Sequence, residues 1–179
     1  MLLGGFCRRR AFVGSSHVPG HRGDLGDLVG GVSVGVARFF ASGNFPVGTL
    51  GAIARTTKTD SPITVGLSNY RLLAHDSNRA FGDEIIQPEP TPFSRVPNDL
   101  IGKLLSREFP ESVYSGVADA AICSVDVPVQ GEVADLGAVA GTNAPSIGML
   151  VTKRGRSTGI THGIVTNSDS EASCWEPTI

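Results

Sequence analysis

The chain has 179 residues, of which 40% are hydrophobic and 18% are charged. This length is enough to bury a core, and the hydrophobic content excludes a chain that is disordered by composition. The formal net charge of −2 excludes the basic footprint of a nucleic-acid-binding protein, so no nucleic-acid partner is expected. The 23 glycines and 11 prolines favour short strands and turns over long helices.

The first 27 residues differ in character from the rest. Residues 1–23 contain no Asp or Glu and carry four arginines. An acid-free start with arginines can be a transit peptide, but we favour the plainer interpretation of a flexible leader or a misassigned start codon. A secretory signal fits poorly, because no long apolar run follows the arginines. No run of 18 apolar residues occurs, so no membrane span is expected, and the cellular location stays open.

After this leader, apolar runs alternate with turn-forming segments. They predict strands at 29–36, 49–54, 63–68, 81–87, 118–125, 147–153 and 159–166, while the run 100–105 fits a strand or a helix. The first three are too close together for crossover helices, which favours antiparallel hairpins. Between the later strands, 127–143 has the composition of a connector. About eight short strands without a convincing amphipathic helix predict an all-β sandwich or barrel.

Asp119 is the most informative single residue, because it interrupts the apolar run 118–125. An acid inside a buried strand is costly unless it has a partner. Two interpretations stay open. Asp119 orients a catalytic histidine, as in an acid–base–nucleophile triad, or it caps a turn or lies at an exposed strand end.

The four histidines form no cluster. His17 and His21 lie in the leader. His75 and His162 lie near predicted strands, where each fits either a general base or an ordinary surface residue.

Three cysteines, Cys7, Cys123 and Cys174, are far apart in the sequence. We expect reduced thiols, with Cys123 buried in its strand. No zinc or calcium ligand spacing and no phosphate-binding glycine loop occurs, so neither a metal nor a cofactor is expected.

A nucleophilic serine is also missing from the motifs. Hydrolytic serines are held in tight turns such as Gly-x-Ser-x-Gly or Gly-Asp-Ser-Gly, and neither occurs. Ser168, Ser170 and Ser173 lie among acidic residues, which is the wrong setting for an oxyanion hole.

Five segments, taken in order, resemble a bacterial group of chymotrypsin-like (trypsin-like) serine peptidases. Residues 67–74, Leu-Ser-Asn-Tyr-Arg-Leu-Leu-Ala, resemble the histidine motif Leu-Ser-Asn-[Trp/Asn]-His-Val-Leu-Ala. Residues 118–122, Ala-Asp-Ala-Ala-Ile, resemble the aspartate motif Val-Asp-Ala-Ala-Ile. Residues 28–35 followed by 48–52 are similar to the opening strands of the family. Residues 82–88 are similar to its segment Gly-Asp-x-Ile-Leu-Gln-Pro, and residues 148–163 resemble its stretch Lys-Ser-Gly-Arg-Thr-Thr-Gly-x-Thr-x-Gly.

This resemblance implies two antiparallel β-barrels with an active site in the cleft between them. It implies a complete first barrel over 28–127, a partial second barrel over 128–166 and a tail over 167–179. Missing strands would leave unpaired edges and exposed apolar faces. The shortfall suggests a truncated or frame-disrupted gene product, because the chain ends before the serine motif of the family.

The resemblance also implies site residues. Asp119 falls on the catalytic aspartate, whereas Arg71 falls on the catalytic histidine position. A guanidinium stays protonated and cannot take a proton from a serine. His75 does not take the place of the catalytic histidine, because the matching residues on both sides of it align with the family motifs without a shift of four positions. The family geometry places the two positions together at the cleft, so we expect an ion pair between Arg71 and Asp119.

We therefore expect a serine endopeptidase homologue that is catalytically inactive. The alternative is a module that binds a peptide or protein in the residual cleft between the barrels, and a third hypothesis is a hydrolase with an unrecognised nucleophile. The oligomeric state cannot be read from these patterns.

Overall fold

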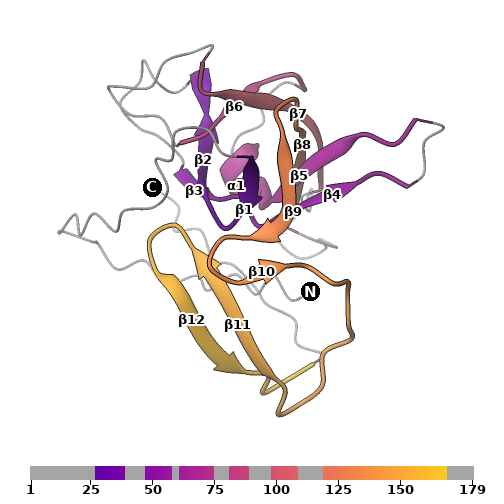
Figure 1. Ribbon diagram of the computed structural model, residues 1–179, viewed down its shortest axis with the longest axis vertical. Helices are drawn as coiled ribbons and strands as arrows, with labels where there is room; N and C mark the ends of the chain where they lie inside the picture. The colour runs from indigo at the N-terminus through magenta and orange to yellow at the C-terminus, as the bar shows by residue number, and fades with distance from the viewer. Residues whose placement is uncertain are drawn as a thin grey trace, which may run out of the picture.

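The computed structural model describes residues 27–38, 47–57, 61–74, 81–88, 98–108 and 119–168. These residues form twelve strands in three sheets and one helix of four residues (Figure 1). The predominantly β fold predicted from the sequence is confirmed. No helix in the described ranges has the length and apolar content needed to cross a membrane.

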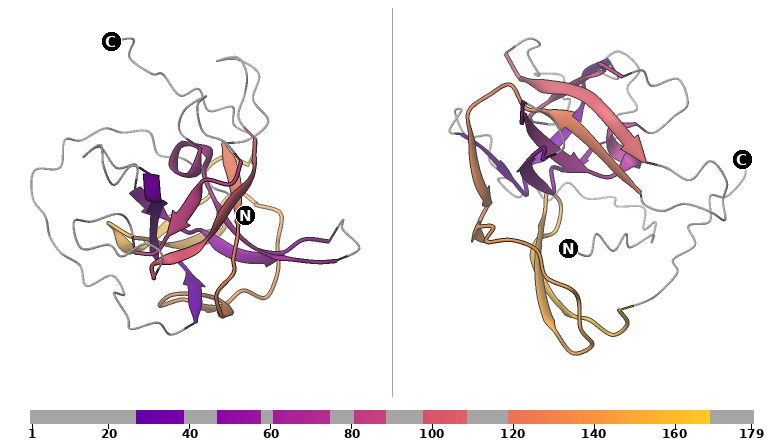
Figure 2. Two further views of the ribbon diagram at one scale, coloured as in Figure 1. Left: turned by 90° about the horizontal axis from the view of Figure 1, so that it is seen from above. Right: turned by 90° about the vertical axis from the view of Figure 1, so that its right-hand side faces the viewer.

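The largest sheet has seven strands in the order β3-β2-β6-β7-β8-β5-β4, and all neighbours are antiparallel. The two edge strands, β3 and β4, are separated in the chain only by Leu50 and Gly51. The sheet must therefore curl round, as Figure 2 shows. Its strands are β2 (Ser33–Val36), β3 (Val47–Thr49), β4 (Ala52–Arg55), β5 (Thr64–Ser68), β6 (Glu84–Ile86), β7 (Leu100–Glu108) and β8 (Ala120–Ser124).

The core fills the inside of this curled sheet. Strand residues that alternate toward the inside supply most of it, as expected for a sheet with one buried face. Leu72 and Leu73 from helix α1 (Tyr70–Leu73) add to the same cluster. The largest fully buried side chains are Leu50, Leu73, Ile85, Ile86, Leu104, Val34, Val36 and Cys123.

Two strands pass unusually close together at Gly102 of β7. A Cβ atom added there would lie 1.9 Å from the carbonyl oxygen of Ser124 in β8. Only glycine leaves room for this approach. The position therefore fixes how tightly β7 can follow the curl of the sheet.

A second sheet has the order β1-β9-β10, formed by β1 (Leu28–Gly30), β9 (Val129–Val133) and β10 (Gly137–Ala138). β1 and β9 are parallel. The interpretation of 127–143 as a connector without strands is therefore wrong. The sequence of β9 contains Gly131 and two polar residues, so its apolar alternation is weak. Val129 nevertheless packs against the core.

A third sheet is the hairpin of β11 (Leu150–Gly155) and β12 (Gly159–Ile164), which projects from the curled sheet in Figures 1 and 2. Its turn end is fastened to the rest of the molecule. Arg154 donates through Nη1 to the carbonyl of Gly31 and through Nε to Oδ2 of Asp135 at 3.0 Å. The amide of Arg156 donates to Oγ1 of Thr49 at 3.0 Å.

Two predicted strands are divided in the structure. The run 29–36 breaks into β1 and β2 at Gly31, whose φ of +81° is accessible mainly to glycine. The run 49–54 breaks at Leu50 and Gly51, where the chain passes from one edge of the large sheet to the other. The ambiguous run 100–105 is a strand, and Tyr70–Leu73 is a short helix that the sequence patterns did not reveal.

Candidate functional site

The candidate site lies where β5 ends and α1 begins. Asn69 has an extended backbone, and its side-chain oxygen accepts a hydrogen bond from the amide of Leu72 at 3.0 Å. This N-cap stops the strand and starts the helix. Because Leu72 and Leu73 face the core, Arg71 is left on the more exposed side, where 31% of its side chain is accessible.

Asp119 is brought to this helix by strand register. β8 pairs with β5 so that Ala121 lies opposite Ser68. Continuing the antiparallel register by two residues places Asp119 beside the first turn of α1. Two segments 48 residues apart in the sequence therefore meet at the same end of one strand pair.

Arg71 and Asp119 are in direct contact. Oδ2 of Asp119 lies 3.6 Å from Nε of Arg71, and Oδ1 accepts from the backbone amide of Arg71 at 3.4 Å. The ion pair expected from the sequence is present. One carboxylate thus performs two tasks, since it pairs with the guanidinium and accepts a hydrogen bond from a backbone amide in the first turn of the helix.

The environment of Asp119 differs from the sequence expectation in one respect. Asp119 lies just before β8 and not within it, and 39% of its side chain is accessible. The interpretation as an acid inside a buried strand is therefore wrong, and the interpretation as a cap at an exposed strand end is correct. The apolar run 118–125 suggested a strand that includes Asp119, but the strand begins only at Ala120.

This arrangement limits the chemistry available at Asp119. In a catalytic triad the carboxylate accepts a hydrogen bond from an imidazole, which then takes a proton from the nucleophile. At this site the carboxylate faces donors of Arg71, and a guanidinium has no basic lone pair to offer. The contact can stabilise the strand end, but it cannot activate a hydroxyl group.

The other candidate residues lie elsewhere or outside the described ranges. His162 contacts Thr152 across the β11–β12 hairpin, with 3.0 Å between Nδ1 and Oγ1. Ser168 is exposed at the end of the described chain. His17, His21, His75, Cys7, Cys174, Ser170 and Ser173 lie outside the described residues.

Cys123 is buried in β8, as predicted. Burial raises the pKa of its thiol to about 11, because the charged thiolate is poorly solvated there. Its Sγ donates to the carbonyl of Gly66 at 3.7 Å. A protonated, enclosed thiol is a poor nucleophile, so Cys123 has a packing role.

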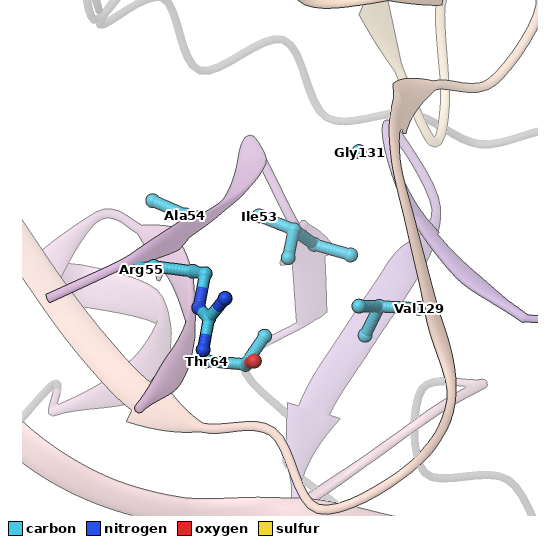
Figure 3. A pocket seen from close by; sticks show the side chains of 6 residues that line it. All are labelled: Ile53, Ala54, Arg55, Thr64, Val129 and Gly131. Atoms are coloured by element: carbon cyan, nitrogen blue, oxygen red, sulfur yellow. The ribbon is translucent and has the colours of Figure 1, made fainter. Parts of the chain in front are cut away.

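The described residues contain no group of three or more His, Cys, Asp or Glu side chains that could hold a metal ion. They do contain a hollow of about 330 Å³ between the β4–β5 hairpin and β9 (Figure 3). Thr64, at the first residue of β5, lines it, whereas Asn69 follows the last. Arg55 and Thr64 lie at the end of the β4–β5 pair away from Ser68, and the hollow shares no lining residue with the candidate site.

One residue with a structural task was not singled out by the sequence analysis. Arg154 is nearly buried, with 5% of its side chain accessible, and it holds the β11–β12 hairpin against the Gly31 turn. The alternation of the predicted strand places Arg154 on the same face as Leu150. This alternation does not show whether the side chain of Arg154 is buried or exposed.

Comparisons with known protein families and with curated proteins find no match for this chain.

Proposed function

We propose that this chain is a catalytically inactive relative of the chymotrypsin-like serine peptidases. In this proposal Arg71 stands at the histidine position and Asp119 at the aspartate position. The observation that carries the proposal is their contact, in which the carboxylate lies 3.6 Å from a guanidinium nitrogen. A residue at the histidine position must lie beside the aspartate and must accept a proton from the nucleophile. Arg71 meets the first requirement and not the second.

Inactivity follows from the missing base. A serine hydroxyl is a weak nucleophile until an adjacent base removes its proton. Arginine cannot do so, because it remains protonated at working pH. The argument rests on Arg71 alone and does not depend on how far the chain extends.

One further feature supports the resemblance. The curled antiparallel sheet brings residues 67–74 and 119–122 together, which belong to the two segments that resemble the histidine and aspartate motifs. The hollow beside Arg55 lies away from this place, so it lends no support to the alternative of a peptide-binding cleft between barrels.

Labelling with a fluorophosphonate probe tests the proposed loss of activity. This probe reacts covalently with serines that a neighbouring base has activated. We expect no labelling of the folded chain, under conditions in which trypsin is labelled to completion. Labelling that is lost on denaturation would reveal an activated serine and overturn the proposal.

A further inference from the structure

The hollow between the β4–β5 hairpin and β9 has the size of a small ligand site (Figure 3). Its volume of about 330 Å³ lies at the lower end of the range of roughly 300–1,000 Å³ that small-molecule sites occupy. Three of the lining residues, Ala54, Arg55 and Gly131, are exposed, so the hollow opens to solvent. The other lining residues are half-buried, namely Ile53, Thr64 and Val129.

Strand register builds a polar end of this hollow. Arg55 lies directly opposite Thr64 in the β4–β5 pair. The amide of Thr56 donates to the carbonyl of Ile63, so that neighbouring pair is hydrogen-bonded and the pair of Arg55 with Thr64 is not. Side chains of a non-hydrogen-bonded pair lie closer together than those of a hydrogen-bonded pair. The guanidinium of Arg55 and the hydroxyl of Thr64 are therefore brought to the same end of the hollow, as Figure 3 shows.

The rest of the hollow is apolar. Ile53 shares a face of the hairpin with Arg55, because alternate residues along a strand point the same way, and Val129 lines the hollow from β9 (Figure 3). Gly131 lies two residues beyond Val129, and a Cβ atom added there would meet nothing within 4 Å. The missing side chain of Gly131 therefore leaves space beside the two apolar walls.

Arg55 brings a positive charge to the hollow that the described chain does not neutralise. Arg38, Arg71 and Arg154 each pair with an aspartate, whereas no ion pair joins the side chain of Arg55 to a residue in the described ranges. None of the described residues that line the hollow is Asp or Glu. A guanidinium binds a carboxylate through two parallel N–H donors, in charge-assisted bonds that are stronger than neutral ones. The polar end thus complements a carboxylate, and the apolar walls complement a hydrocarbon group.

We propose that this hollow binds a small monocarboxylate with a short hydrocarbon body. The carboxylate pairs with Arg55 and accepts a hydrogen bond from the hydroxyl of Thr64, and the hydrocarbon lies between Ile53 and Val129. A free carboxylic acid and an apolar residue at the C-terminus of a peptide both offer this chemistry. Because the hollow is open and supplies one charged partner, we expect a dissociation constant in about the millimolar range. This proposal does not depend on the proposed loss of peptidase activity.

An NMR chemical-shift titration of the full chain with isocaproate tests the proposal. We expect saturable shifts that are confined to residues 53–55, Thr64 and 129–131. Isocaproamide has the same hydrocarbon body without the charge, and it should bind at least ~5-fold more weakly. The peptide acetyl-Gly-Gly-Leu, with a free carboxylate, represents the second source of this chemistry. Tighter binding of the peptide than of isocaproate would support a C-terminal residue as the ligand, and the reverse order would support a free acid.

Two variants test the roles of the charge and of the open space. Arg55→Gln removes the guanidinium and should weaken the binding of isocaproate at least ~5-fold. Lys103→Gln is the matched control, because it removes an exposed cation of β7 that does not line the hollow, and it should leave binding within about twofold of wild type. Gly131→Val fills the space beside Val129 with a residue that strands favour, and it should abolish the saturable shifts.

Circular dichroism confirms that each variant is folded. The absence of saturable shifts with both isocaproate and the peptide, up to ~20 mM of each, would overturn the proposal. Equal weakening by Arg55→Gln and Lys103→Gln would overturn it as well, because binding would then depend on the overall charge and not on the hollow. Equal binding of isocaproate and isocaproamide would do so too, because the carboxylate would then make no specific contact.

Discussion

Asp119 contacts Arg71 through both carboxylate oxygens, one to the guanidinium at 3.6 Å and one to the backbone amide at 3.4 Å. The side-chain contact depends on the residue at position 71, whereas the amide contact exists for any residue with the same backbone. The first contact is therefore specific to arginine, whereas the second is a property of the first turn of the helix. The strand register of β5 and β8 provides both.

A double-mutant cycle between Arg71→Met and Asp119→Asn measures the side-chain contact. We expect a coupling free energy of at most about 1 kcal/mol, because both groups are about a third exposed and water screens their attraction. Urea unfolding of the four chains gives the value. A coupling of several kcal/mol would mean that the pair is shielded from solvent and would contradict this description.

Gly102→Ala should be strongly destabilising. The added methyl group would lie 1.9 Å from the carbonyl oxygen of Ser124, so the two strands must separate. We expect a loss of about 2–4 kcal/mol in the free energy of unfolding. Gly131→Ala is the matched control in β9, where an added Cβ meets nothing within 4 Å. A comparable loss in both variants would show that strand propensity, and not the close approach, is being measured.

Cys123 makes the stability depend on pH in the alkaline range. The pKa of its thiol rises from 9.0 to about 11 on folding. The folded chain therefore holds this proton more tightly than the unfolded chain. The resulting contribution to the free energy of unfolding is complete below pH 9 and is lost as the pH rises toward 11. Two pH units correspond to about 2–3 kcal/mol. The difference in unfolding free energy between wild type and Cys123→Ala should narrow by this amount across that window. A constant difference would show that the thiol does not titrate with a raised pKa.

Arg154→Met should loosen the β11–β12 hairpin while leaving the curled sheet intact. The substitution keeps the apolar stem but removes the bonds to Gly31 and Asp135. We expect a cost of about 1–3 kcal/mol, because the Gly31 carbonyl loses its donor. Hydrogen exchange should accelerate in 150–164 and stay unchanged in β5 and β8. Unchanged exchange in the hairpin would mean that Arg154 does not anchor it.

The β-strands were largely predictable, because alternation and β-branched residues mark a half-buried sheet. The strand β9 was missed since Gly131 and its polar neighbours hide the alternation. The helix α1 was missed because four residues are too few to show a helical period. Which strands would be neighbours in the seven-stranded sheet was also not predictable, as this order depends on contacts between distant segments.

The contact at the candidate site was predicted only through the family resemblance. Nothing in the local patterns around Arg71 or Asp119 links two residues that are 48 positions apart. The exposure of Asp119 was not predicted, because the sequence around an acid looks the same whether the acid lies inside a strand or just before it. Whether Asp119 is buried depends on the residue at which β8 begins to pair with β5.

The most direct test of the account is an NMR titration of the imidazole introduced by Arg71→His. If position 71 faces Asp119, the carboxylate favours the charged imidazolium and raises its pKa. We predict that adding Asp119→Asn lowers this pKa again, since the negative charge is then absent. An imidazole that titrates identically with and without Asp119→Asn would show that position 71 does not face the carboxylate, and it would contradict the assignment of Arg71 to the histidine position.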